Sequence, residues 1–565
     1  MNTEIIGIVA MFFITLLLAI PLGKYISKVF NNEKTFLDRI FRPIEDLFFR
    51  ISGINTTNEM TWQDSLKAML SINLVWFTLC FLILLNQGWL PLNPDANPSM
   101  SPDLAFNTAI SFIVNCNLQH YSGESGVSYL SQLVGLMYLH FVSAATGMAV
   151  AAIVFNAMKE RQTSKLGNFY NYFLKSITRI LLPISIVIAI ILTFNGMPMT
   201  FEGKDTISTL QGENIQVSRG PVAAFVAIKH LGTNGGGFFG ANSAHPFENP
   251  NYFTNMVEMI AQMFIPFAMI FALGYFLKRK KLAWSIWGVM TLGFLLLAVP
   301  TIVAEMNGNP AIAKMGISQN LGAMEGKEVR FGAAASGYWS IATTVISTGS
   351  VNSMHDSSMP LSGAMQLLAM MVNAFYGGCG VGFLNYYIFI ILAVFISGLM
   401  VGRTPELLGK KVEAREVKIA AIIAILHPFL ILVGTALASY YAKNDTAVGW
   451  LNNPSFHGFS EMLYEFTSSA ANNGSGFEGL GDNNPFWNIS TGFVLLLSRF
   501  IPITGPVAIA GLLANKKYIP ESAGTLKIDN STFAIMTFTV IFIIAALSFF
   551  PALALGPLAE YFSIY

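Results

Sequence analysis

Four segments of the chain share a polar, glycine-rich pattern that could bind a cation. They read AFNTAISFIVNCNLQHYSGES, AAFVAIKHLGTNGGGFFGANS, YWSIATTVISTGSVNSMHDSS and LYEFTSSAANNGSGFEGLGDN, and they superimpose without gaps when Cys116, Gly235, Gly349 and Gly474 are aligned. Glycine accepts backbone angles that strain other residues, so successive carbonyl groups can face one point. Rings of such carbonyls replace the hydration shell of a monovalent cation. Magnesium or calcium would require carboxylate ligands, which these tripeptides lack.

The aligned column defines the residues that we expect to line such a filter. The segments recur about every 120 residues, and a repeat of this kind dictates the architecture. The first segment has Cys116 where the others have glycine, so we expect a filter without fourfold symmetry. The expected filter residues are Asn115, Cys116, Asn117, Asn234, Gly235, Gly236, Thr348, Gly349, Ser350, Asn473, Gly474 and Ser475.

The rest of the chain must supply the helices that hold these segments. Of 565 residues, 53% are hydrophobic and 11% are charged, with a net charge of +1. This composition excludes a soluble enzyme of this size and a broad nucleic-acid-binding face. A bilayer-spanning helix needs about 20 mostly apolar residues. Such stretches run over 4–23, 66–86, 129–156, 177–194, 253–277, 282–304, 383–401, 418–440, 488–512 and 531–553.

Lysine and arginine cluster in alternate loops between these stretches, which predicts that those loops are cytoplasmic and that both termini lie outside. Each glycine-rich segment then falls on the outer side, between two helices. Non-helical backbone survives inside a membrane only where it lines a wet cavity or is buried in protein. The pattern predicts an all-α polytopic membrane protein with ten transmembrane helices, in which four helix, pore-loop, helix repeats surround one central pore.

The expected divisions of the chain follow from these repeats. They are an extra N-terminal helix in 1–30, repeats in 60–158, 174–280, 281–403 and 416–515, and an extra C-terminal helix in 530–565. The third repeat breaks its second helix at GGCGVG, residues 377–382, which must line a cavity or form a hinge. Arg499 lies in the middle of a predicted span, where an arginine is expected to face the interior of the protein.

Three longer motifs carry a resemblance to a known family. HLGTNGGGFFGANSAHPFENP at 230–250, GSVNSMHDSSMPLSG at 349–363 and NNGSGFEGLGDNNPFW at 472–487 resemble the KdpA family. Its members are the potassium-binding subunits of Kdp potassium-transporting ATPases, related to the Trk, Ktr and HKT transporters. The resemblance spans the whole chain, including the first and last helices. It adds Gln119 and Thr233 to the expected filter.

The resemblance also implies a function and partners. It implies that K⁺ is the substrate and that the chain passes extracellular K⁺ through an intramembrane tunnel to a KdpB-type P-type ATPase subunit. KdpC-type and small KdpF-type subunits are the further partners it implies. It places the chain in a bacterial plasma membrane, with the filters facing the extracellular side and with no organic cofactor. A gating role is implied for Gly377, Gly378, Gly380, Gly382 and Arg499.

Other interpretations of these features remain open. The sequence has no G-x-x-x-x-G-K-[ST] or DKTGT motif, so a pump subunit would depend on a partner for ATP hydrolysis. The alternative function is a stand-alone uptake channel of the Trk or Ktr kind. The glycines at 377–382 could form a passive kink, and Arg499 could cap carbonyls of the broken helix. Two G-x-G-x-x-G matches, at 235–240 and 474–479, do not indicate a dinucleotide site because neither follows a predicted strand.

Charged and polar residues near the outer face complete the pattern. Five carboxylates follow the filter segments and could attract cations or simply be solvated: Glu124, Glu248, Asp356, Glu478 and Asp482. Five histidines there lack metal-ligand spacing and are expected to be polar loop residues: His120, His230, His245, His355 and His457.

Overall fold

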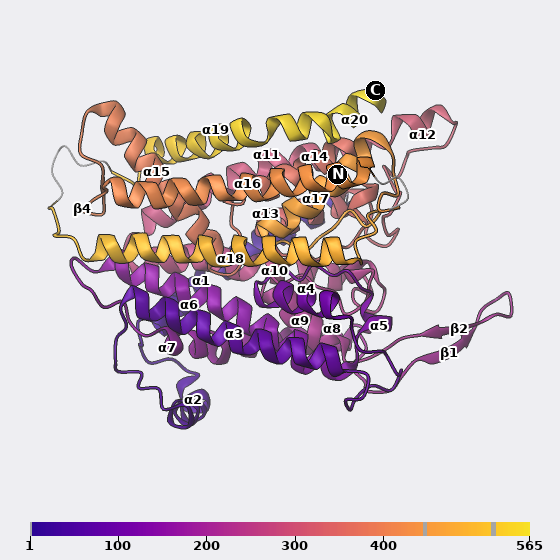
Figure 1. The fold of residues 1–565 in the computed structure, drawn as a ribbon, viewed down its shortest axis with the longest axis horizontal. Coiled ribbons are helices and arrows are strands. Elements are labelled where there is room, and N and C mark those ends of the chain that lie inside the picture. Colours follow the sequence, from indigo (N-terminus) through magenta and orange to yellow (C-terminus); the bar gives the residue numbers. More distant parts are fainter. Residues whose placement is uncertain (1–2, 445–448, 521–526, 565) are drawn as a thin grey trace.

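The computed structural model describes residues 3–444, 449–520 and 527–564. Within these ranges, ten helical segments are long and apolar enough to cross a membrane, and each coincides with one predicted stretch apart from small differences at the ends. They run side by side along the horizontal direction of Figure 1. They are α1 (Thr3–Phe30), α3 (Trp62–Asn86), η1 with α6 (Ser131–Met137, Tyr138–Lys159), α7, η2 and α8 (Phe169–Ser176, Ile177–Leu181, Leu182–Phe194), α10 (Tyr252–Phe276), α11 (Lys280–Asn307), α15 (Val381–Val401), α16 (Ala414–Asn444), α18 (Pro485–Ala514) and α19 (Ser531–Leu555).

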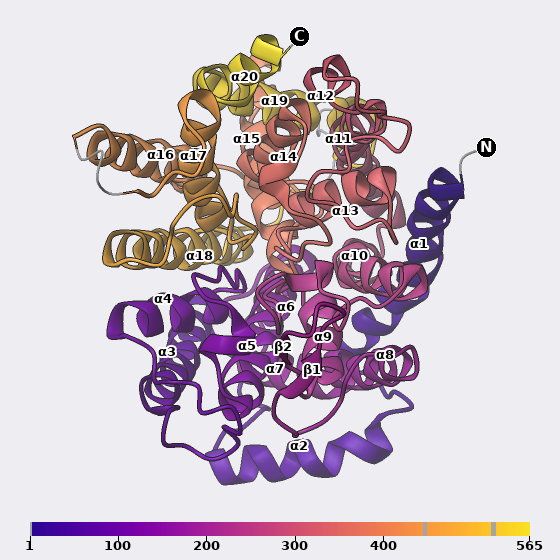
Figure 2. The same ribbon diagram turned by 90° about the vertical axis from the view of Figure 1, so that its right-hand side faces the viewer.

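Four shorter helices carry the filter segments into the molecule. They are α4 (Pro102–Ile113), α9 (Val222–Leu231), α13 (Ala333–Ile346) and α17 (Ser455–Ala471), and each stands between two of the long helices in the chain. Figure 2, which looks along the long helices, shows the four following one another around the centre. Almost all of their residues are buried. The predicted all-helical membrane fold with four internal pore helices is therefore confirmed.

These pore helices begin and end for local reasons. In α4, Pro102 occupies the first turn, where its missing N–H is not needed. α13 and α17 end at Ser347 and Asn472, which adopt the left-handed conformation and stop the helical hydrogen bonding. The non-helical filter backbone therefore begins directly after these residues.

The third repeat contains the predicted helix break. α14 (Pro360–Val372) ends at Asn373, which has a φ of 43°, and α15 begins at Val381. The intervening backbone includes left-handed residues at Tyr376, Gly377 and Gly380. This loop lies inside the helix bundle and is not a surface connection, because most of its residues are buried.

The connecting segments gather at the two ends of the bundle. At the end where α1 begins, Figure 1 shows α5 (Gly123–Gly126), the antiparallel hairpin β1 (Asp205–Ser208) with β2 (Asn214–Val217), α12 (Pro310–Lys314) and α20 (Pro557–Ile564). Two 3₁₀ turns, η3 (Asn242–Ala244) and η4 (His355–Ser357), lie at the ends of the second and third filter segments. The hairpin β3 (Glu406–Leu407) with β4 (Lys410–Lys411) lies at the opposite end.

The amphipathic helix α2 (Asp38–Ser52) lies across the long helices, since it is seen end-on in Figure 1 and lengthwise in Figure 2. Arg179 holds it in place, with Nη1 2.6 Å from Asp38 Oδ1 and Nε 2.7 Å from Glu45 Oε1. Glu45 is buried, so this ion pair fixes which face of α2 meets the bundle.

Candidate functional site

The four filter segments follow their pore helices with one shared hydrogen-bond pattern. In each segment a backbone N–H donates to the carbonyl five residues earlier, and the residues on either side of that N–H have positive φ. The donors are Cys116 to Ser111 (3.0 Å), and Asn234 to Lys229, Thr348 to Thr343 and Asn473 to Ser468 (2.9 Å each). The following residues, with their φ values, are Asn117 (62°), Gly235 (90°), Gly349 (88°) and Gly474 (104°).

This pattern corrects the register of the first segment. Cys116 is equivalent to Asn234, Thr348 and Asn473, and Asn117 takes the place of the three glycines. The predicted alignment of Cys116 with the glycines is therefore wrong by one residue. Asparagine tolerates the left-handed conformation better than most residues other than glycine, so Asn117 can make the turn. A gapless comparison of residue types does not detect this shift, because the backbone angles set the register.

The four segments lie against one another in chain order and close a ring. Asn115 Nδ2 donates to the carbonyl oxygen of Thr233 at 2.7 Å, which joins the first segment to the second. At the other three junctions a glycine packs on a carbonyl oxygen of the next segment. A Cβ atom would lie 1.7 Å from the Thr348 oxygen if added to Gly235, 2.2 Å from the Asn473 oxygen if added to Gly349, and 2.0 Å from the Cys116 oxygen if added to Gly474.

One level of this ring carries four equivalent carbonyl groups without donors. Its residues, Cys116, Asn234, Thr348 and Asn473, are completely buried. Their carbonyl oxygens accept no hydrogen bond from the residues that the structure describes. Buried carbonyl groups normally have a partner. Rings of such oxygens are the backbone ligands that replace the hydration shell of a monovalent cation in selectivity filters.

Side chains around the ring hold its outer levels in place. Trp339 Nε1 donates to the carbonyl oxygen of Ser350 at 2.8 Å, and the hydroxyls of Tyr464 and Ser475 are hydrogen-bonded at 2.8 Å. Gln119 makes two bonds with the backbone of Gly237, at 2.9 and 2.7 Å. The amide of Gln119 is therefore committed to joining the first and second segments. Gly236, another expected filter residue, packs on Asn117 at the same junction.

A cavity of about 80 Å³ lies at the inner end of the ring. The wall next to the ring is formed by the residues two positions before Asn117, Gly349 and Gly474, namely Asn115, Ser347 and Asn472. Gly378 and Arg499 also line it, and it continues between α15, α16, α18 and α19. The cavity therefore adjoins both the inner end of the ring and the loop between α14 and α15.

The loop between α14 and α15 touches the ring directly. Cys379 N–H donates to Thr233 Oγ1 at 3.0 Å, and a Cβ added to Gly378 would lie 3.3 Å from the same oxygen. On its other side the loop packs tightly on α6, since a Cβ added to Gly380 would lie 2.3 Å from the carbonyl oxygen of Gly147. Gly377 packs just as closely on Gly382, with 2.3 Å from its added Cβ to the Gly382 Cα. The four glycines thus let the loop fit between the filter and α6.

Arg499 provides a buried positive charge beside this loop. Its side chain is 5% exposed, and Nη2 donates to the carbonyl oxygen of Ser143 at 3.3 Å. No carboxylate in the described ranges forms an ion pair with it. Ser143 Oγ in turn donates to Asn115 Oδ1 at 2.8 Å. Ser143 therefore connects the guanidinium of Arg499 to the first filter segment. The carbonyl it contacts belongs to α6 and not to the broken helix.

Comparison with known proteins identifies the family. The family model described as KdpA, potassium-transporting ATPase A subunit, matches residues 9–562. The chain belongs to the KdpA family. It is 76% identical to the potassium-transporting ATPase potassium-binding subunit of Flavobacterium johnsoniae and 74% identical to that of Flavobacterium psychrophilum, over the full length of each protein. Its fold is similar to the crystal structure of the potassium transporter TrkH from Vibrio parahaemolyticus, with a TM-score of 0.50, 14% identity, and 89% and 98% coverage of the two chains.

The outer face of this KdpA-family chain differs from the expectation of simple solvated groups. Asp356 Oδ1 lies 2.8 Å from His457 Nε2, and His457 Nδ1 lies 2.9 Å from Glu560 Oε1 of α20. We call these three residues the outer triad. Burial alone would lower the pKa of His457, but the two carboxylates raise it to about 10. The outer triad therefore ties the last helix of the chain to the start of α17 through a charged imidazolium.

Three of the histidines expected in polar loops are instead buried and hydrogen-bonded. His120 Nδ1 lies 2.6 Å from Asn488 Oδ1, His230 Nε2 lies 2.9 Å from Glu258 Oε2, and His355 Nδ1 lies 2.8 Å from the Tyr464 hydroxyl. That prediction was wrong because their partners lie far away in the sequence. Likewise Glu248 is completely buried and pairs with Lys229 at 2.6 Å, whereas Glu478 is exposed.

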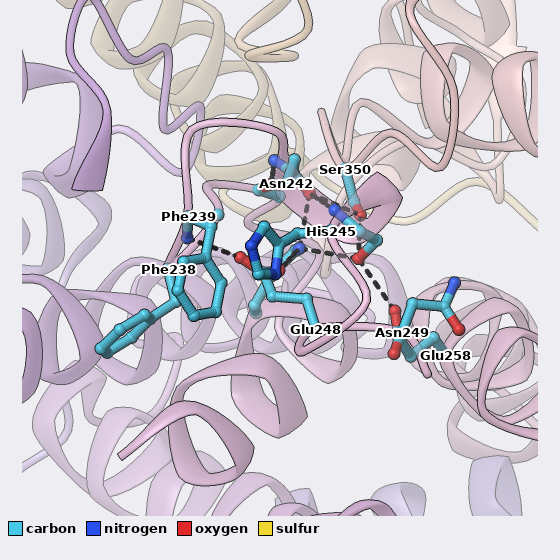
Figure 3. Close-up of polar contacts among 12 residues, drawn as sticks. Phe238, Phe239, Asn242, His245, Glu248, Asn249, Glu258 and Ser350 are labelled. Atoms are coloured by element: carbon cyan, nitrogen blue, oxygen red, sulfur yellow. Dashed lines mark hydrogen bonds and ion pairs between the residues drawn. The ribbon is translucent and has the colours of Figure 1, made fainter. Parts of the chain in front are cut away.

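Lys229, Asn242, Ser243 and Glu258 were not predicted from the sequence as site residues. They form a buried polar cluster behind the second filter segment; Asn242, Glu248 and Glu258 are drawn in Figure 3. One signal was available: Lys229 and His230 lie near the end of the otherwise apolar pore helix α9, VAAFVAIKHL. A charged residue in such a helix needs a buried partner.

Proposed function

We propose that the chain is the potassium-binding subunit of a Kdp potassium-transporting ATPase and that it binds extracellular K⁺ at the filter ring. The single observation that carries this proposal is the closed ring formed by Cys116, Asn234, Thr348 and Asn473, whose four buried carbonyl oxygens accept no hydrogen bond from the described residues. Membership of the KdpA family supports it. The adjoining levels, which include Asn117, Gly235, Gly349 and Gly474, are proposed to provide further carbonyl ligands.

We propose that K⁺ then enters the cavity below the ring and leaves sideways toward a KdpB-type subunit, which hydrolyses ATP. The cavity extends between α15, α16, α18 and α19, which supports a lateral path. The loop of Gly377, Gly378, Gly380 and Gly382 is proposed to close the direct route to the cytoplasm. Arg499 lies on the same cavity, and its charge would repel a cation that continued straight through.

The proposed setting follows from the same function. KdpC-type and small KdpF-type subunits are the further proposed partners. The proposed location is a bacterial plasma membrane, with the end that carries α5, α12 and the β1–β2 hairpin facing outward. This orientation agrees with the loops rich in lysine and arginine lying at the opposite end.

The test is K⁺ transport in liposomes by the chain alone and by the chain assembled with its subunits. We expect the complex to hydrolyse ATP in response to submillimolar K⁺ and to accumulate K⁺, while the isolated chain conducts little. Robust K⁺ flux through the isolated chain, without stimulation by ATP, would instead support a stand-alone Trk-like or Ktr-like transporter. The outward orientation is checked by labelling single cysteines placed in the β1–β2 hairpin of whole cells.

A further inference from the structure

Lys229 stands where the other three segments have a small hydroxyl side chain. It is the residue whose carbonyl accepts the filter N–H groups of the second segment, at 2.9 Å from Asn234 and 3.3 Å from Gly235. Its equivalents are Ser111, Thr343 and Ser468. Because the Lys229 side chain is completely buried, the second segment alone has a lysine ammonium directly behind its filter strand at this position.

The ammonium of Lys229 has three partners for its three N–H donors. Nζ donates to Asn242 Oδ1 at 2.5 Å, Ser243 Oγ at 2.9 Å and Glu248 Oε2 at 2.6 Å. The other oxygen of Glu248 accepts the N–H of Phe239 at 2.8 Å, a contact visible in Figure 3. An isolated charge would be expelled from such a site, and the pairing with Glu248 explains how the lysine remains there.

Asn242 transmits the position of this ammonium to the filter. Its Nδ2 donates to the carbonyl oxygen of Gly235 at 2.7 Å, while Oδ1 also accepts from Ser350 Oγ of the third segment at 3.2 Å. Figure 3 shows Asn242 and Ser350 facing each other. Turning the amide over would point its N–H₂ group at the ammonium and its oxygen at the Gly235 oxygen. Both contacts would be repulsive. The ammonium therefore favours the observed orientation of Asn242, together with the N–H of Ser243, which donates to Oδ1 at 2.8 Å, and the N–H of Val351 at 3.4 Å.

The Gly235 residue is consequently held at both of its backbone polar groups by Lys229. Its N–H contacts the Lys229 carbonyl, and its carbonyl is connected to Nζ through Asn242. The carbonyls of Gly349 and Gly474, at the same level, accept no hydrogen bond from the described part of the chain. Without a cation, the carbonyl dipoles of such a ring repel one another and tend to push the strands out of the binding conformation. A strand that is already held in that conformation loses less conformational freedom when the ion binds, which lowers the cost of binding.

We infer that Lys229 is a positioning residue that, through Asn242, keeps the second filter strand in its ion-binding conformation when K⁺ is scarce. The inference rests on the proposed function of the ring as a K⁺ filter. Lys229 does not touch the ion. It favours tight binding by organising the site beforehand, and it should affect the K⁺ concentration required for half-maximal activity more than the maximal rate.

The test uses the assembled complex and two independent ways of removing the restraint. Asn242→Ala removes the link and leaves the Lys229–Glu248 pair intact. Lys229→Met with Glu248→Gln removes both charges together, so that no unpaired charge is left. In each we expect the half-saturating K⁺ concentration for ATP hydrolysis to rise about tenfold, the loss expected for a hydrogen bond to a charged network. The maximal rate should stay within about twofold and the preference for K⁺ over Rb⁺ should fall.

Two features of the result separate positioning from general damage. Combining all three substitutions should raise the half-saturating concentration no further, because both routes remove the same restraint. Thr254→Val is the matched control: it removes a buried hydroxyl of the same repeat that bonds Asn249 Oδ1 at 2.8 Å and the backbone of Asn251 at the start of α10, and none of these partners is a filter residue. The control should leave the K⁺ dependence and the Rb⁺ ratio unchanged.

A K⁺ dependence within twofold of wild type in folded Asn242→Ala complex would overturn the inference, as would full additivity of the two routes. Should Asn242→Ala not assemble, Asn242→Asp keeps the side-chain shape and the acceptor for Lys229 but loses the donor to Gly235, and it must show the same rise. If the wild-type complex itself does not respond to K⁺, the proposed function fails. A responsive wild type with unaffected Asn242 variants refutes only the positioning role.

Discussion

Gly474→Ala is the most direct perturbation of the ring, because its effect can be worked out from one contact. The added Cβ would lie 2.0 Å from the carbonyl oxygen of Cys116. Carbon and oxygen atoms that are not bonded stay about 1 Å further apart than this, so the fourth and first segments must separate by that amount. Alanine at a φ of 104° also adds roughly 1–2 kcal/mol of backbone strain.

The displacement falls on an oxygen of the proposed cation site itself. In a preorganised catalytic site, a misplacement of about 1 Å can lower the rate about a hundredfold, and we expect a loss of similar size for a preorganised ion site. We therefore expect the half-saturating K⁺ concentration of the assembled complex to rise by about two orders of magnitude, with reduced discrimination against Rb⁺ and Na⁺. The assay is ATP hydrolysis against K⁺, Rb⁺ and Na⁺ concentration.

Gly288→Ala is the matched control for this substitution. Gly288 lies within α11, and a Cβ there would meet no atom within 4 Å. Alanine should stabilise the helix by roughly 0.5–1 kcal/mol and leave the K⁺ response unchanged. A Gly474→Ala complex with a K⁺ affinity within threefold of wild type and unaltered selectivity would refute the reasoning that the glycines bring the segments into a closed ring.

Three further predictions concern the register, the cavity and the outer face. Asn117 and not Cys116 makes the left-handed turn. Asn117→Val should therefore weaken K⁺ binding about tenfold or more, whereas Cys116→Ala should change it less than twofold. A K⁺ titration in which Cys116→Ala has the larger effect would restore the sequence-based register. Arg499→Gln should increase K⁺ leak into ATP-free liposomes, and an unchanged leak with unchanged pumping would remove its role as a barrier. His457→Gln should lower the melting temperature most below about pH 6.5, where the charged histidine contributes fully to stability. The difference in melting temperature from wild type should vanish as the pH approaches 10, the folded-state pKa of His457. A difference that is constant with pH would exclude the charged outer triad.

Much of the fold could be predicted from local sequence properties. Hydrophobic stretches of about 20 residues specify membrane helices whatever their neighbours are, and all ten are present at the predicted places. The broken helix at 373–380 could also be predicted, because Gly377, Gly378, Gly380 and Gly382 interrupt an apolar run too long for one crossing.

The register of the first filter segment shows where residue types alone are insufficient. Asn115, Cys116 and Asn117 offer two asparagines that can both adopt positive φ, so the sequence permits either alignment. The N–H of Cys116 bonding to the carbonyl of Ser111 selects one of them. The choice depends on the geometry at the end of α4, which residue identity does not encode directly.

The sequence by itself determined the helical membrane fold, the four-part repeat and the places where non-helical, glycine-rich backbone enters the helix bundle. These depend on hydrophobicity and on the conformational freedom of glycine, which act over a few neighbouring residues. Only the tertiary structure decided that Gln119 binds Gly237, that Gly474 meets Cys116 and that Lys229 orients Asn242. Those contacts form only when separate segments converge at one buried centre, where charges and amides must find partners because water is excluded.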